Sequence, residues 1–139
     1  MQRRYLQLDV FSERVGQGNP LGVVVDCKGL DSAAMQAIAG WLNLSETIFL
    51  LPPDAGASYQ LRIFTPRQEL PFAGHPSVGA AWAALELGLA EAGESRELVQ
   101  QCAAGLLPVK VVGSRWFRQL HVRTPPAQHR DAAIGPLPT

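Results

Sequence analysis

Residues Glu69–Gly88 read ELPFAGHPSVGAAWAALELG, and this stretch decides the fold of the chain. Between Pro76 and Leu87 it carries one charge, Glu86, among alanine, valine, leucine and tryptophan. A helix that is apolar on nearly every face belongs inside a core. Pro76 suits the first turn of such a helix, and Gly88 suits the position just past its end. The stretch therefore predicts one buried helix with the rest of the chain packed around it.

The segments on either side predict a sheet and a second helix. Asp31 and Ser32 form a typical N-terminal cap for a helix over residues 33–42. Apolar alternation and short apolar runs predict strands at residues 4–11, 21–25, 47–51, 59–64, 98–102, 107–112 and 116–122. The predicted fold class is α+β, with a strongly curved, barrel-like mixed sheet, one helix inside it and one outside. Residues 1–123 form one predicted lobe, and the proline-rich residues 124–139 a tail or crossover.

Composition excludes several classes of protein. The 139 residues suffice for one domain, and 12 basic against 12 acidic residues leave no net charge to attract nucleic acid. No apolar run approaches the roughly 20 residues of a membrane span, and the first residues lack a signal-peptide core. Cys27 and Cys102 match neither a zinc site nor a disulfide framework. We therefore expect a cytoplasmic protein that binds no metal, nucleic acid or membrane.

The start of the buried helix is the best candidate for a functional site. Backbone N–H groups and the positive end of the helix dipole at Gly74–Ser77 predict a seat for an anion. His75 lies in this turn, where a histidine is more often a cap or a packing residue than a functional one. Glu46 leads an apolar strand, so partial desolvation would suit a general base. A solvated glutamate at the head of a strand is the simpler alternative for Glu46.

Five blocks of sequence, in this order, resemble the phenazine-biosynthesis PhzF family. They are Asp9–Phe11, Gly18–Pro20, Leu44–Thr47, Arg62–Pro66 and Glu69–Ser77. Members of this family are similar in fold to diaminopimelate epimerase: two similar halves, each a sheet rolled around a central helix, enclose the active site between them. The resemblance covers about residues 5–126 and so implies one such half.

The resemblance implies catalytic roles for two residues. Glu46 matches the family's glutamate base, which takes a proton from a substrate carbon and returns it elsewhere without a metal or an organic cofactor. His75 matches the histidine of the family's Gly-His motif, which lines the cleft and assists the proton transfer. The substrate implied is a small carboxylated molecule.

The resemblance also implies binding positions. The helix start, at Gly74, Pro76 and Ser77, matches the segment that holds a substrate carboxylate, and Asn19 and Ser45 match positions that line the cleft. Ala73 occupies the place where epimerase relatives carry a catalytic cysteine, which argues against two-thiol racemisation.

Members of the family are about twice as long as this chain, and their second half supplies the other wall of the cleft with an acidic partner. We therefore expect either a fragment of a longer product or a half-length protein that forms a homodimer or pairs with a second half. Two functions stay open. One is a PhzF-like isomerase or epimerase, and the other is a catalytically incomplete half-domain with a binding or vestigial role.

Overall fold

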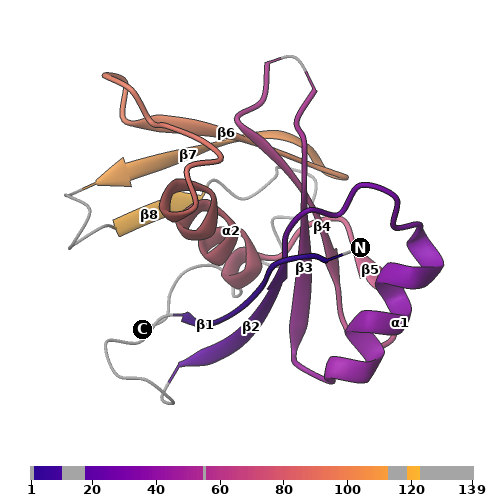
Figure 1. Ribbon diagram of the computed structural model, residues 1–139. Coiled ribbons are helices and arrows are strands. Elements are labelled where there is room, and N and C mark those ends of the chain that lie inside the picture. The colour runs from indigo at the N-terminus through magenta and orange to yellow at the C-terminus, as the bar shows by residue number, and fades with distance from the viewer. Residues whose placement is uncertain (1, 11–17, 55, 113–118, 123–139) are drawn as a thin grey trace.

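The computed structural model describes residues 2–10, 18–54, 56–112 and 119–122, which form one curved mixed sheet with a helix on each face. Helix α2 (Gly74–Glu86) lies inside the curve and α1 (Ser32–Leu42) lies outside it (Figure 1). In sheet order the strands are β1 (Tyr5–Val10), β2 (Asn19–Val24), β3 (Glu46–Leu51), β4 (Tyr59–Phe64), β6 (Glu97–Cys102), β7 (Gly105–Val112) and β8 (Gln119–Val122), and β5 (Glu69–Leu70) pairs with β4. The α+β class predicted from the sequence is confirmed.

Each helix connects two strands that lie side by side and run parallel. Strands β2 and β3 are parallel and are joined through α1, and β4 and β6 are parallel and are joined through α2. The other described strand pairs are antiparallel. Parallel neighbours need a crossover connection, so the two helices are the elements that make this sheet mixed.

Helix α1 begins at Ser32, one residue before the predicted start. The carboxylate of its N-cap, Asp31, accepts a hydrogen bond from the Ala34 amide at 2.8 Å, and the C-cap Asn43, just past the last helical residue, has a left-handed φ of 55°. Beneath α1 the rings of Phe49 and Phe64 pack edge to face with centroids 5.4 Å apart. This small core holds α1 on the outer face of the sheet, together with Val24, Cys27, Met35 and Ala39.

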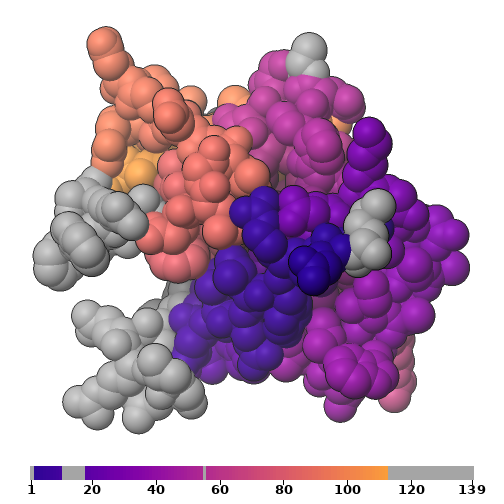
Figure 2. All heavy atoms as spheres, viewed as in Figure 1, coloured from indigo at the N-terminus to yellow at the C-terminus, as the bar shows by residue number. Residues whose placement is uncertain are grey.

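Helix α2 begins at Gly74, two residues before the predicted start, and Gly88 follows its end with a φ of 73°. Its alanines pack in the larger core, but one stripe of the helix is not covered by the described residues. Trp82 is 37% exposed, and Leu89, just past the helix, is 42% exposed. In Figure 2 the salmon-coloured atoms of this part of the chain lie at the surface, between the indigo N-terminal strands and the orange β6–β7 region. The expectation of burial on every face therefore holds for most of α2 and fails along this stripe.

Other differences from the predicted elements are small. Strand β2 starts at Asn19 rather than Leu21, because Asn19-Pro20, expected as a turn, pairs with the end of β1. The two-residue strand β5 was not predicted. The predicted strand residues 116–118 and the predicted tail at 124–139 lie outside the described residues. In the described segments no helix is both long enough and apolar enough to span a bilayer.

Candidate functional site

Glu46 and His75, named separately from the sequence, meet in the folded chain. Oε1 of Glu46 lies 2.8 Å from Nδ1 of His75, a distance at which the imidazole N–H donates to the carboxylate. The two side chains are 20% and 12% exposed, so they are largely shielded but still reached by solvent. A carboxylate held by an imidazole in this way can accept a proton and pass it on.

The alternation of β3 places Glu46 on the inner face of the sheet. Glu46 is the first residue of this strand and lies opposite Leu21 in the parallel register of β2 and β3. Ile48 belongs to the core around α2, whereas Phe49 belongs to the core under α1. Glu46 has the same parity as Ile48 and therefore faces α2, whose second residue is His75.

The N-terminus of α2 lies beside this pair and carries no side-chain cap. Ala73 is the N-cap residue and has no side chain that could bond the first turn. The Glu69 side chain, which precedes the helix, is bonded to Arg62 at 2.6 Å and does not cap it. Pro76 has no N–H, and the Ser77 amide donates to the Ala73 carbonyl at 3.2 Å. An anion at this helix start would therefore meet fewer backbone N–H groups than the Gly74–Ser77 span expected from sequence.

We predict that a small anion binds at this turn. The positive end of a helix dipole favours a negative charge, and an uncapped N-terminus offers backbone N–H groups to it. Titration with inorganic phosphate, followed by ¹⁵N NMR, should shift the Gly74 amide resonance in a saturable way. The Ala34 amide provides an internal control, because Asp31 already caps the start of α1. Equal shifts at the two helix starts would contradict a specific seat at α2.

The other residues expected to bind substrate divide into two groups. Asn19 and Ser45 are exposed and lie at the end of the sheet where β2 and β3 begin, the same end as Glu46. Ser77 is fully buried, and its hydroxyl donates to the Ala73 carbonyl at 2.8 Å. The Ser77 side chain thus contacts the protein interior rather than the space beside Glu46.

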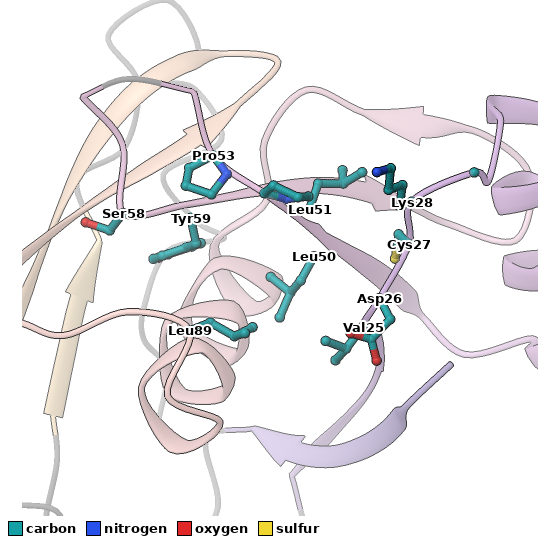
Figure 3. Close-up of a pocket in the computed structure, with 12 residues that line it drawn as sticks. Val25, Asp26, Cys27, Lys28, Leu50, Leu51, Pro53, Ser58, Tyr59 and Leu89 are labelled. Atoms are coloured by element: carbon teal, nitrogen blue, oxygen red, sulfur yellow. The ribbon is translucent and has the colours of Figure 1, made fainter. Parts of the chain in front are cut away.

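A pocket of about 800 Å³ lies at the opposite end of the sheet (Figure 3). It opens where β3 ends and where the chain leaves α2, whereas Glu46 starts β3 and His75 starts α2. Its lining is mostly apolar and includes Val25, Cys27, Leu50, Pro53, Tyr59 and Leu89. The candidate acid–base pair is therefore separate from this pocket.

The cysteines and the metal-binding residue types form no second site in the described segments. Cys27 and Cys102 are free thiols, and burial raises the pKa of Cys27 to about 11, so Cys27 is protonated at neutral pH. No group of three or more histidine, cysteine, aspartate or glutamate side chains is arranged around a common point among the described residues.

Comparison with known proteins identifies the family of this chain. The family profile described as phenazine biosynthesis-like protein, PhzC-PhzF, matches residues 8–131. The chain belongs to the PhzF family.

Relatives of this PhzF-family chain include isomerases. An uncharacterized isomerase from Mesorhizobium japonicum is 53% identical over 114 residues, which cover 81% of this chain and 36% of the relative. The trans-2,3-dihydro-3-hydroxyanthranilate isomerase of Pseudomonas aeruginosa is 48% identical over 78 residues, which cover 56% of this chain and 28% of that enzyme. The crystal structure of a PhzF-family protein from Bacillus anthracis matches with a TM-score of 0.77 and 34% identity, over 88% of this chain and 41% of that one. The chain thus spans less than half the length of these relatives.

Sequence reasoning missed the buried polar residue Gln100 of this PhzF-family chain. Gln100 is fully buried on β6 and bonds both Tyr59 and Ser77. The signal was present in the strand pattern: Gln100 has the same parity as the inward-facing Leu98, and a polar side chain at an inward position needs partners. A glutamine at such a position indicates a buried hydrogen-bond network.

Proposed function

We propose that this chain forms one wall of a PhzF-type isomerase site that moves a proton on a small carboxylated substrate. The observation that carries the proposal is the 2.8 Å contact between Glu46 and His75 beside the uncapped start of α2. A base on β3, a proton partner in the first turn of α2 and an anion seat at the start of that helix are the parts that such a reaction needs.

The proposed reaction is a proton transfer that balances within the substrate. The Glu46 carboxylate takes a proton from a carbon, and the electron pair of that C–H bond stays in the conjugated system of the substrate. Protonated Glu46, assisted by His75, then returns the proton to another carbon. No atom is gained or lost, and no electron leaves the substrate. The N-terminus of α2 at Gly74 holds the carboxylate, which fixes the reacting carbon near Glu46.

The direct test is deuterium incorporation from D₂O. The probe is trans-2,3-dihydro-3-hydroxyanthranilate, a cyclic carboxylate on which the Pseudomonas relatives act by name. Mass spectrometry and proton NMR should show deuterium at a carbon of the recovered ligand only when protein is present. Absence of exchange into this compound and into a panel of related small carboxylates would overturn the proposal.

The second candidate function is a binding half-domain without a complete catalytic site. The matched regions cover 36–41% of the Mesorhizobium and Bacillus relatives, so a large part of each relative has no counterpart in the match. Under this alternative the anion seat binds ligand but no exchange follows. Phosphate binding at Gly74 together with no deuterium exchange would select this function over the isomerase.

We also predict that the chain associates with a second copy or another lobe. Trp82 and Leu89 expose apolar surface along α2, and such patches often mark a contact. A twofold homodimer would bring two copies of Glu46 to one composite cleft. Sedimentation at micromolar concentration should give a mass above the 15.0 kDa of one chain. A well-folded species at the monomer mass would contradict self-association.

A further inference from the structure

A series of buried hydrogen bonds runs from the sheet into the first turn of α2. The Tyr59 hydroxyl donates to Gln100 Oε1 at 3.2 Å, and Gln100 Nε2 donates to the Ser77 hydroxyl at 3.0 Å. The Ser77 hydroxyl then donates to the Ala73 carbonyl at 2.8 Å. Tyr59 is 2% exposed, and Gln100 and Ser77 are fully buried, so water does not compete for these bonds. A satisfied buried network of this kind favours a single arrangement of its neighbours.

At the sheet end of this network, the hydrogen bond from Tyr59 fixes the orientation of the Gln100 amide. Tyr59 and Gln100 are opposite each other in the parallel pair of β4 and β6. Burial raises the pKa of Tyr59, so its hydroxyl stays protonated and donates to the Gln100 oxygen. Because the oxygen of Gln100 faces Tyr59, its NH₂ group faces Ser77, with a further weak contact to Cys102 Sγ at 3.8 Å. Every polar atom of the Gln100 amide has a partner.

The helix end of the network fixes one peptide group. The Ala73 carbonyl accepts hydrogen bonds from both the hydroxyl and the amide of Ser77, at 2.8 and 3.2 Å. In a trans peptide the C=O and the following N–H point in opposite directions. Since the Ala73 carbonyl points along the helix toward Ser77, the Gly74 N–H points out of the helix start. His75 follows immediately on the same turn.

We propose that Gln100 is a positioning residue for the Glu46–His75 site. By holding Ser77 against the Ala73 carbonyl, it sets the direction of the Gly74 N–H and the place of His75 relative to Glu46. The inference rests on the proposed function, because it assigns Gln100 a part in that same site. Gln100 acts through Ser77 and the Ala73–Gly74 peptide and does not touch the substrate.

The test compares Gln100→Met with Tyr59→Phe in the full chain. Methionine fills similar space but bonds neither Ser77 nor Tyr59, so the Gly74 amide and the His75 Nδ1 resonances should move in ¹⁵N NMR. The affinity for inorganic phosphate should fall about tenfold, the scale of one lost hydrogen bond in a buried network. Tyr59→Phe also removes a buried hydrogen bond but keeps the link from Gln100 to Ser77. Its phosphate affinity should change by less than about twofold, although its stability also falls.

Each outcome decides the proposal. Equal losses of affinity in the two variants would indicate general loosening of the core, and an unchanged Gln100→Met would show that Gln100 has no positioning role. If Gln100→Met does not fold, Ser77→Ala replaces it, and a folded Ser77→Ala with wild-type affinity overturns the proposal. If the wild-type chain binds no phosphate, faster exchange of the His75 Nδ1 proton with water in Gln100→Met, and not in Tyr59→Phe, is the deciding result. Deuterium exchange into carboxylates by the wild type is a separate measurement, so the proposed function can fail without this inference failing.

Discussion

Replacing Glu46 with glutamine is expected to lower deuterium exchange into a carboxylate substrate by about 10²–10⁴-fold, the usual contribution of a general base. The amide has nearly the shape of the carboxylate and can still accept a hydrogen bond from His75 Nδ1, which lies 2.8 Å from Oε1 in the wild type. It cannot accept the substrate proton at neutral pH. Fold and anion binding at Gly74 should therefore persist while exchange is lost, as measured by proton NMR in D₂O.

Glu69→Gln supplies the matched control for Glu46→Gln. Glu69 is also a partly exposed carboxylate with a hydrogen-bonded partner, Arg62, at 2.6 Å, but it lies on β5 and is bonded away from the start of α2. Its replacement should cost a little stability and leave exchange unchanged. Equal exchange rates in the wild type and Glu46→Gln would show that the base is another residue.

The second large effect is expected at Gly79, where α2 packs most closely on the sheet. A Cβ at this position would overlap Cδ2 of Leu21 and lie 3.4 Å from Cγ2 of Val10. Leu21 is fully buried, so its side chain has little room to move away. Gly79→Ala should lower the free energy of unfolding by about 1–3 kcal/mol, the range for an overpacked core. This loss should appear although alanine is favoured over glycine within a helix by about 1 kcal/mol.

A double-mutant cycle with Leu21→Ala separates packing from helix propensity. Leu21→Ala alone should cost about 2–5 kcal/mol, because it leaves a cavity against Gly79. In that background Gly79→Ala should become stabilising, since the new methyl group enters the cavity and the helix gains propensity. Urea denaturation measures all four proteins. A stabilising Gly79→Ala in the wild-type background would contradict the close approach of α2 to Leu21.

The helices and strands of this fold could be predicted from the spacing of apolar residues wherever one face of a segment is buried. Strand β4 was predicted residue for residue, because Leu61 and Ile63 alternate with Arg62 and the turn at Thr65-Pro66 ends the strand. Helix α2 was predicted from its alanine-rich composition, and only its start was displaced. Strand β5 was missed because two residues carry no periodicity, and its pairing depends on the course of the chain between β4 and α2.

The site was predictable only in parts. Local sequence pattern points to His75 and to Glu46 separately but does not predict that the two side chains touch. Their contact depends on the register of β3 and on the crossing of α2 over the sheet. The resemblance to the PhzF family supplied that link. The resemblance implied a binding position at Ser77 through its place in the helix start. The rotation of α2, which composition does not reveal, turns the Ser77 side chain inward, where its hydroxyl accepts a hydrogen bond from Gln100 Nε2.

The two parallel crossovers imply an order of events during folding. The hairpins β1–β2, β3–β4 and β6–β7 join neighbouring segments, whereas β4 meets β6 only after the chain from residue 65 to residue 96 has closed into a loop. Loop closure over a longer segment carries a larger entropic cost, so local pairings form faster than distant ones. Glu46 lies before this loop and His75 lies within it. The Glu46–His75 contact is therefore expected to form later in folding than the local hairpins.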